Sequence, residues 1–308
     1  MTILPLRPAH AEAARAVWNR AAPLDPLSPA LFHEKVWGEP EGTALAAAVG
    51  DVLVGLGVGA LWPTADAVRG SVRLLAVAPE RRRGGVGTRL LAALEADLAG
   101  RGATAFRVGE AAPNYLTPGV DLRYQDGLAF AAARGYRDVG EAVNLGVDLA
   151  RDPWAGRDRA PWSTAADEAR LAALGFGVRR ATGADRPALG RLLDAHWPAW
   201  HAEADRALAR GPAGRPAPLH LAVRGGAAVG FAAYDANNVG TGWFGPMGTA
   251  PAARGLGVGA VLLRRCLADL ARAGRDRATV AWAAALPFYE QACEATVERQ
   301  FRRVEKAT

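Results

Sequence analysis

The feature that most constrains this chain is an internal repeat. Residues 78–91 (APERRRGGVGTRLL) and 250–263 (APAARGLGVGAVLL) are identical at eight of fourteen positions. The same offset of 172 residues places 6–9 (LRPA) over 178–181 (VRRA), and each of these opens a pattern typical of a strand followed by a helix. Because one offset relates two distant pairs of segments, we infer duplication of a whole domain.

Both halves also have the same expected order of elements. Short β-prone runs separated by turn residues predict hairpins at 48–55 and 222–230. Each half then reads as strand, helix, hairpin, strand, glycine-rich loop, helix, strand, helix, which predicts an α/β domain. A chain of 308 residues is long enough for two such domains.

The join between the halves has its own signals. Residues 151–163 are rich in Pro, Gly and charge, as linkers often are. Residues 164–174 predict a short connecting helix that begins at a Ser or Thr cap. We therefore expect a first domain at 1–150, a linker and connecting helix at 151–174, and a second domain at 175–308.

Composition argues against several classes of function. The net charge of +6 comes almost wholly from arginine, since Lys35 and Lys306 are the only lysines, and no basic face stands out, so nucleic acid is not an expected partner. Cys266 and Cys293 are too few for a disulfide framework and lack metal-ligand spacing. The most apolar stretch, 43–62, contains an aspartate and four glycines, which predicts a hairpin rather than a membrane span. We expect a cytoplasmic protein without a metal or membrane partner.

A glycine-rich loop follows a strand in each repeat. The strands expected at 72–77 and 243–249 both run into Arg-x-x-Gly-x-Gly and then into an apolar-periodic helix. Because glycine has no Cβ, successive main-chain amides can point at one ligand. The N-terminal amides of the helix add the positive end of its dipole. Each loop therefore predicts a cradle for a pyrophosphate group.

Two other phosphate-binding loops do not fit these residues. A dinucleotide fingerprint needs Gly-x-Gly-x-x-Gly after the first strand and an acidic residue about twenty positions later, and neither half has both. A nucleotide P-loop ends in Gly-Lys-Ser/Thr, and neither loop contains a lysine. An NTPase is thereby excluded.

The loops resemble those of the GNAT superfamily of N-acetyltransferases, whose signature Arg/Gln-x-x-Gly-x-Gly/Ala binds the pyrophosphate of acetyl-CoA. The two openings, the late segment 288–290 (FYE) and its divergent counterpart 129–136 (AFAAARGY) are similar to other parts of that family. The resemblance implies an α/β (α+β) fold of two tandem GNAT-type domains, each a mixed, mostly antiparallel sheet flanked by helices, with acetyl-CoA as co-substrate. The residues implied to bind it are Val77, Arg82, Arg83, Gly84, Gly85, Val86, Gly87, Thr88, Thr249, Arg254, Gly255, Leu256, Gly257, Val258, Gly259 and Ala260.

Acetyl transfer to an amine needs a donor to the thioester carbonyl, a base for the amine proton and an acid for the leaving thiolate. The resemblance places the donor amides in the fourth strand, around Ala76 and Val77 in one half and Gly248 and Thr249 in the other. In this family the acid is commonly a tyrosine just after the phenylalanine of the late helix, which implies Tyr289 as the catalytic acid.

The first repeat lacks that tyrosine, because Ala131 occupies the aligned position. An unusual loop at 113–124 supplies Tyr115 and Tyr124 as alternative acids, and packing as a turn is the other interpretation. The second half is therefore the preferred catalyst.

The sequence leaves the general base and the acceptor pocket open. The candidate bases are Glu39, Glu41, Glu110, Glu203, Asp205 and Asp235. Trp197, Trp200 and Trp243 either line the second pocket or belong to the core. His196 and His201 lack a matching third ligand, so a metal site is not expected, and neither cysteine is interpreted as a nucleophile.

We therefore expect an acetyl-CoA-dependent N-acetyltransferase that transfers the acetyl group directly to a primary amine of a small molecule. Two alternatives stay open. One is a CoA-binding module in which one or both halves lack turnover, and the other is a transferase with a protein acceptor.

Overall fold

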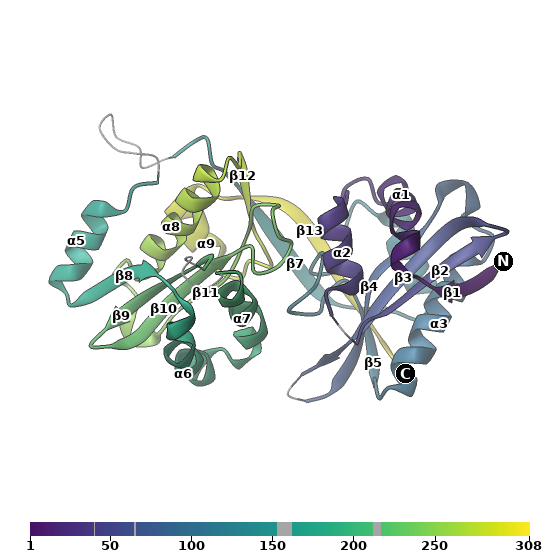
Figure 1. Ribbon diagram of the computed structural model, residues 1–308, viewed down its shortest axis with the longest axis horizontal. Helices are drawn as coiled ribbons and strands as arrows, with labels where there is room; N and C mark the ends of the chain where they lie inside the picture. Colours follow the sequence, from purple (N-terminus) through teal and green to yellow (C-terminus); the bar gives the residue numbers. More distant parts are fainter. Residues whose placement is uncertain (40, 65, 153–161, 212–216) are drawn as a thin grey trace. The chain divides into compact units, whose positions relative to one another are not determined.

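The computed structural model describes residues 1–39, 41–64, 66–152, 162–211 and 217–308. It divides into two compact units. Unit 1 comprises Met1–Ala142 together with Gln300–Thr308, and unit 2 comprises Val143–Arg299. Each unit is a mixed sheet with helices on both faces (Figure 1).

In unit 1 the strand order is β1-β2-β3-β4-β5-β13, in which only the β4–β5 pair is parallel. Its elements are β1 (Thr2–Pro5), the 3-10 helix η1 (Pro8–His10), α1 (Ala11–Ala21), α2 (Pro29–Trp37), β2 (Thr43–Val49), β3 (Val52–Pro63), β4 (Val68–Val77), η2 (Pro79–Arg81), α3 (Val86–Gly100), β5 (Ala105–Val108), β6 (Val120–Asp121), α4 (Gln125–Ala133) and the start of β7 (Arg137–Asp148).

In unit 2 the strand order is β7-β12-β11-β10-β9-β8, with β11 and β12 as its parallel pair. Its further elements are α5 (Ala165–Ala173), β8 (Phe176–Arg180), η3 (Gly183–Asp185), α6 (Arg186–His196), η4 (Pro198–Trp200), α7 (His201–Ala209), β9 (Leu219–Arg224), β10 (Ala227–Tyr234), β11 (Trp243–Thr249), η5 (Pro251–Ala253), α8 (Val258–Arg272), β12 (Arg277–Val280), α9 (Leu286–Cys293) and the start of β13 (Thr296–Ala307). The expected order of elements and both expected hairpins are thus confirmed.

The sheet of unit 1 separates two apolar layers. One contains α1 and α2, whose Val17 and Phe32 pack with Leu56 and Leu74 of the sheet. The other face packs against α3, and there every second residue of β3 is a glycine. Each of these glycines lies against one leucine of α3, and an added Cβ would stand 2.7–3.0 Å from that leucine's side chain: Gly55 against Leu90, Gly57 against Leu94 and Gly59 against Leu98. The glycines therefore let α3, and with it the glycine loop at its start, lie close to the sheet.

Unit 2 repeats this layering with one addition. Helices α6 and α7 cover one face of the sheet, and α8 and α9 pack with the core of the other. Helix α5, the expected connecting helix, joins the α8 layer through Leu171, which is completely buried. The rest of the expected linker falls mostly on 153–161, which lies outside the described residues.

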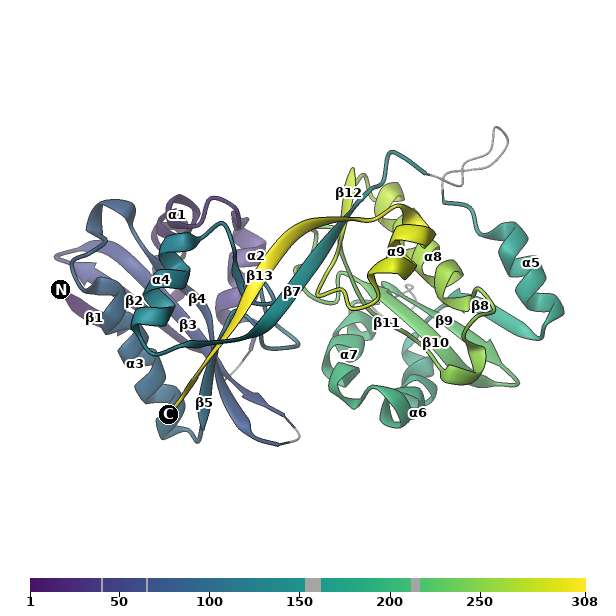
Figure 2. The same ribbon diagram turned by 180° about the vertical axis from the view of Figure 1, so that it is seen from behind.

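The last strand of each repeat completes the sheet of the other unit. Strand β13, from the second repeat, pairs antiparallel with β5, setting Glu305 opposite Arg107. Strand β7, from the first repeat, pairs antiparallel with β12, setting Leu145 opposite Val280. Figure 2 shows the yellow end of β13 beside β5 at the C-terminus. The units therefore differ from the expected domains 1–150 and 175–308, because an exchange of strands leaves no mark in local spacing.

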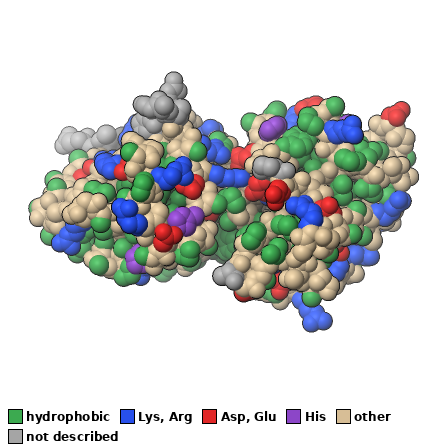
Figure 3. All heavy atoms as spheres, turned by 60° about the horizontal axis from the view of Figure 1, so that its bottom comes forward, with side chains coloured by type: hydrophobic (Ala, Val, Ile, Leu, Met, Phe, Trp, Pro, Cys, Tyr) green, Lys and Arg blue, Asp and Glu red, His purple; other side chains and the backbone are tan. Residues whose placement is uncertain are grey.

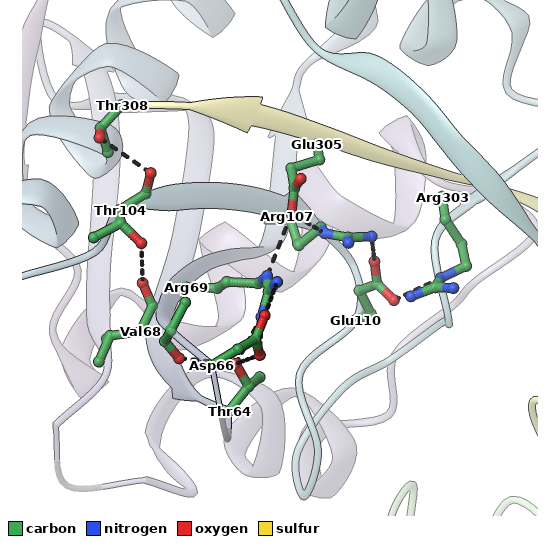
Figure 4. Close-up of polar contacts among 11 residues, drawn as sticks. Thr64, Asp66, Val68, Arg69, Thr104, Arg107, Glu110, Arg303, Glu305 and Thr308 are labelled. Atoms are coloured by element: carbon green, nitrogen blue, oxygen red, sulfur yellow. Dashed lines mark hydrogen bonds and ion pairs between the residues drawn. The ribbon is translucent and has the colours of Figure 1, made fainter.

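Ion pairs fasten β13 within unit 1 (Figure 4). The carboxylate of Glu305 accepts hydrogen bonds from Arg107 at 2.7 Å and from Arg69 at 3.3 Å. Burial opposes ionisation of Glu305, but these two guanidinium groups lower its pKa. Arg303 of the same strand donates to Glu110 at 2.8 Å, and Arg107 donates to that carboxylate at 2.7 Å. Strand β13 is thus held in unit 1 by ion pairs as well as by its main-chain hydrogen bonds.

Charged side chains are mixed on the face drawn in Figure 3. Lys and Arg side chains lie among Asp and Glu side chains there and do not gather into one basic patch. None of the described helices is long and apolar enough to cross a membrane.

Candidate active site

In both units the parallel strand pair separates at the same point of the repeat. In unit 1, β4 pairs with β5 over Arg69–Val72 and then continues to Val77. In unit 2, β11 pairs with β12 at Trp243 and Phe244 and then continues to Thr249. We use the term splay for the place where the two strands of each parallel pair separate.

A β-bulge accompanies each splay. In unit 1 the register with β3 shifts at Arg73. In unit 2 the register with β10 shifts across Gly245–Pro246. Arg73 and Gly245 are related by the same offset of 172 residues, so the duplication preserved the backbone irregularity together with the loop. Bulges bend a strand and leave an extra residue outside the ladder, which opens the edge of β4 and of β11 to a ligand.

The register shows which amides of β4 face the splay. The N–H of Ala78 donates to the carbonyl of Val54 at 2.9 Å, and bonded and non-bonded pairs alternate along an antiparallel ladder. Ala76 is therefore bonded to β3, whereas the main-chain groups of Leu75 and Val77 point toward the splay.

The same alternation holds in β11. The N–H of Ala250 donates to the carbonyl of Val229 at 2.9 Å. Because bonded pairs alternate, Gly248 is hydrogen-bonded to β10, while the main-chain groups of Met247 and Thr249 point toward the splay. Of the four amides that the sequence suggested as donors to the thioester, Val77 and Thr249 have this orientation, and Ala76 and Gly248 do not.

The glycine loops join each splay to the start of a helix. Gly85 and Gly257 stand at the N-cap positions of α3 and α8 with φ of +79° and +88°. Two residues earlier, Arg83 and Gly255 also have positive φ, at +62° and +74°. Alternation of left-handed residues with others turns successive N–H groups inward and makes an anion-binding nest. The loops therefore have the backbone geometry of an anion-binding nest in both units.

The arginine of each Arg-x-x-Gly-x-Gly motif hydrogen-bonds to main-chain carbonyl groups next to the loop. Arg82 donates from Nε to the carbonyl of Val77 at 3.4 Å and from Nη2 to the carbonyl of Ala21 at 3.1 Å. Arg254 donates from Nε to the carbonyl of Thr249 at 3.0 Å. Both side chains thus tie the loop back to the end of the strand.

The late helix of each repeat packs on the second glycine of the loop. A Cβ on Gly87 would stand 3.5 Å from the ring of Phe130, and one on Gly259 would stand 3.5 Å from the ring of Phe288. The two phenylalanines are therefore structural equivalents. This equivalence places Ala131 of unit 1 where unit 2 has the residue after Phe288.

That residue, Tyr289, lies at the splay of unit 2. Its ring is 6.3 Å from that of Phe244, the last paired residue of β11, and 5.0 Å from that of Phe288. Burial, with a contribution from Cys293, raises the pKa of Tyr289 to about 12. The phenol is therefore protonated at neutral pH, which is the state a proton donor needs.

Neither cysteine has the properties of a nucleophile. Burial raises the pKa of Cys293 to about 12, although hydrogen bonding from Ala295 opposes the rise. Burial also raises the pKa of Cys266, which is completely enclosed in the core. Both thiols stay protonated, and only the thiolate is reactive.

The two alternative acids of unit 1 are held inside the fold. Tyr124 donates to the carboxylate of Asp25 at 2.9 Å and accepts from the N–H of Leu24 at 3.0 Å. Tyr115 is 5% exposed. Ala131, at the position of Tyr289, is itself buried in the core of that unit.

Most of the candidate bases are engaged in ion pairs or hydrogen bonds. Glu110 accepts from two arginines, as described above. The other contacts pair Glu39 with Arg73, pair Asp205 with Arg186, and join Asp235 to the N–H of Gly240 at 3.0 Å. Glu41 is exposed, and Glu203 is buried on α7. Of the six, Glu203 combines burial with a place on the α6–α7 face of the sheet.

The tryptophans and histidines of unit 2 are also placed. An added Cβ on Gly248 would stand 2.7 Å from the ring of Trp197, which stacks on Trp200 at 5.5 Å. These two rings therefore cover β11 next to the splay, while Trp243 is a buried strand residue. His201 pairs with Asp194 at 2.8 Å. Among the residues that the structure describes, no group of three or more side chains suits a metal ion.

A charged network beside the unit 1 splay was missed by sequence reasoning. Arg73 is 4% exposed, donates to the carbonyl of Lys35 at 3.0 Å and pairs with Glu39. Lys35 is fully buried and contacts Asn114 at 2.9 Å and Glu34 at 2.9 Å. The only signal in the sequence is an arginine within an otherwise apolar strand segment.

The equivalent position in unit 2 is open. Apart from Gly245 and its two chain neighbours, no described residue has an atom within 4 Å of the position that a Cβ on Gly245 would take. The bulge residue therefore fills the space beside the splay in unit 1 and leaves it free in unit 2.

The duplicated unit with splayed strands and a glycine loop agrees with the resemblance to acetyltransferases in the sequence. The acetyltransferase (GNAT) family matches residues 6–116 and 187–294, and the chain belongs to this family. Comparison with curated proteins gives no match.

Solved structures agree on the fold. The chain is similar to the GCN5-related glucosamine N-acetyltransferase region of a fungal multi-domain GH3 β-N-acetylglucosaminidase, with 19% identity and a TM-score of 0.82 over 99% of this chain and 38% of that one. A tandem GNAT protein from the clavulanic acid biosynthesis pathway gives 18% identity and a TM-score of 0.67 over 99% and 98% of the two chains. A GCN5-related N-acetyltransferase from Sphaerobacter thermophilus gives 17% identity and 0.64 over 99% and 95%.

Proposed function

We propose that the protein is an acetyl-CoA-dependent N-acetyltransferase in which unit 2 transfers the acetyl group directly to a primary amine of a small molecule. The observation that carries the proposal is the meeting of three features at one splay. These are the cradle that ends at Gly257, the outward amides of Met247 and Thr249, and the protonated phenol of Tyr289.

The residues of unit 2 fit the cofactor. A side chain at Gly259 would meet Thr249 and Phe288 at 3.3–3.5 Å, so the loop keeps its backbone close to the strand and bare of side chains. We assign the pyrophosphate to this loop and to the first amides of α8, where the helix dipole favours an anion. Bound acetyl-CoA supplies the acetyl group as an activated thioester.

The chemistry then depends on hydrogen bonds from the protein. The N–H of Met247 or Thr249 donates to the thioester oxygen, where negative charge develops during attack by the amine. Tyr289 gives its proton to the departing sulfur; its pKa of about 12 keeps it protonated before transfer. A lysine-like amine, with a pKa near 10.4, is mostly charged at neutral pH, so it gives one proton to water or to a carboxylate before it attacks. Its nitrogen loses a second proton as the amide forms, and Tyr289 regains a proton.

For unit 1 we propose cofactor binding without turnover. Its loop and outward amides match those of unit 2. However, Ala131 replaces the acid, and Arg73 occupies the space beside the splay. These two differences favour a binding role for this half.

Titration calorimetry of acetyl-CoA into the intact protein tests the cofactor assignment by counting sites. Two sites are expected, and no binding would overturn the assignment. Release of free CoA with a panel of amino sugars, polyamines and amino acids then tests the reaction. If no primary amine is acetylated while CoA binds, the small-molecule proposal is wrong and binding alone remains.

A further inference from the structure

The glycine loop of unit 2 is covered by a helix outside the segments that match the family. Arg170 of α5 donates from Nη1 to the carbonyl of Leu256 at 3.0 Å. Its Nη2 stands 2.5 Å from the position that a Cβ on Gly257 would take. The side chain is 51% exposed, so the guanidinium lies against the loop and still reaches solvent.

Helix α5 is attached to α8 by ion pairs and by apolar packing. Asp167 pairs with Arg264 at 2.9 Å, and Glu168 accepts two hydrogen bonds from Arg265, each at 2.8 Å. Together with the buried Leu171, these contacts bind one face of α5 to α8. The position of Arg170 is therefore determined by the packing of α5 against α8.

The loop of unit 1 is different at both points. Apart from Gly85 and its two chain neighbours, no described residue has an atom within 4 Å of the Cβ position at Gly85. That loop carries its own arginine, Arg83, in a left-handed conformation, and the equivalent residue of unit 2 is Gly255. Unit 2 thus lacks a cation at this position of the loop and receives one from α5.

The electrostatics of this placement indicate an anion. The N-terminal end of a helix is its positive end, where a cation is unfavourable and an anion is stabilised. Arg170 stands at that end of α8, against the loop that leads into it. Asp167, whose carboxylate is 3.7 Å from Nη2 of Arg170, offsets part of this cost. An anion held between the guanidinium and the loop amides would offset more of it, and guanidinium groups bind phosphate through paired hydrogen bonds.

We infer that Arg170 is a binding residue for the pyrophosphate of the cofactor in unit 2, supplied by a helix outside the family domain. This rests on the proposed use of acetyl-CoA. It also assigns α5 a role: by positioning Arg170, the helix makes the cradle of unit 2 different from that of unit 1.

The test uses the full-length chain with Gly85→Glu, so that only unit 2 binds. Calorimetry compares CoA with pantetheine, which lacks the pyrophosphate, in three variants of that background. Arg170→Gln removes the charge, Arg170→Lys keeps it, and Arg272→Gln removes a charge from the far end of α8, where Arg272 is 72% exposed.

We expect Arg170→Gln to weaken CoA binding about tenfold, as for loss of one charge-assisted contact, and Arg170→Lys to recover part of that loss. Pantetheine binding is expected to be unchanged throughout, and Arg272→Gln to behave as the parent. Equal or tighter CoA binding by Arg170→Gln would overturn the inference, and so would an equal loss with pantetheine. Absence of CoA binding in the Gly85→Glu parent would instead refute the cofactor assignment for unit 2.

Discussion

Unit 1 and unit 2 have the same backbone features at the candidate site and differ in the side chains around them. Both have the bulge, the splay and the glycine loop at positions 172 residues apart. At the bulge, however, unit 1 has the buried Arg73 and unit 2 has Gly245, and after the equivalent phenylalanines unit 1 has Ala131 and unit 2 has Tyr289. Under the proposed function, cofactor binding depends on the backbone and is expected in both copies, whereas transfer depends on side chains and is expected in one.

The exchange of β7 and β13 means that unit 1 depends on the end of the chain. Removing residues 300–308 takes away the part of β13 that pairs with β5, the buried Phe301 and the ion pairs of Arg303 and Glu305. Loss of one buried phenylalanine alone costs about 3–5 kcal/mol, so we expect unit 1 to unfold. Hydrogen exchange should rise across β5 and β6 while α8 stays protected.

Removal of Thr308 alone is the control for that truncation and should leave exchange unchanged. If β5 keeps its protection without residues 300–308, the pairing of β13 in unit 1 is not what stabilises that sheet.

A glutamate in each cradle separates the units functionally. Gly257→Glu puts a negative side chain where the pyrophosphate is assigned, and we expect turnover to fall at least about 100-fold as transition-state contacts are lost. Gly85→Glu should leave turnover within about twofold if unit 1 only binds. Each variant should reduce the CoA sites from two to one. The opposite pattern of turnover would make unit 1 the catalyst.

Tyr289→Phe tests the acid without disturbing the cradle. General acid catalysis contributes about 100-fold or more, so kcat should fall by about that factor while the Kd for CoA is unchanged. Tyr234→Phe is a suitable control, since its hydroxyl accepts from Arg180 of β8, on the side of β10 opposite to β11. Unchanged turnover in Tyr289→Phe would refute the assigned role.

The burial of Tyr289 also predicts a dependence of stability on high pH. Its pKa is raised from 10 to about 12 in the folded state. The stabilisation is therefore complete below pH 10 and is lost as the pH rises toward 12. A shift of two units corresponds to roughly 2–3 kcal/mol. Chemical denaturation at pH 9 and 11.5 should show a smaller loss for Tyr289→Phe than for the parent, and equal losses would mean that the phenol is exposed.

Single alanines give the finest comparison of the two loops. Gly85→Ala and Gly257→Ala each place a side chain at positive φ, with a destabilisation of about 1 kcal/mol. Gly257→Ala should lose more, because its Cβ meets Arg170, whereas that of Gly85→Ala meets no described atom. Denaturation curves of the two variants should differ in that direction. The difference should disappear when Arg170→Ala is added to both.

The duplication, the order of elements, the two glycine loops and the late aromatic segments can all be recognised in the sequence. These features depend on backbone requirements that leave local marks, such as glycine at positive φ and apolar residues at a fixed period. The match of Phe130 with Phe288, and hence of Ala131 with Tyr289, was implied by the resemblance of both late segments to the family, and the packing of both rings on the glycine loops agrees with it.

The tertiary structure was needed to show which strands complete each sheet, which amides face the splay, and where the long charged side chains lie. Pairing of β13 with β5 joins residues about 200 positions apart, and its free energy comes from burial and ion pairs that no local pattern records. Arg73 and Arg170 show the same limit, because an arginine reaches several ångströms from its own backbone. Its partner is therefore set by packing across the fold rather than by its neighbours in the sequence.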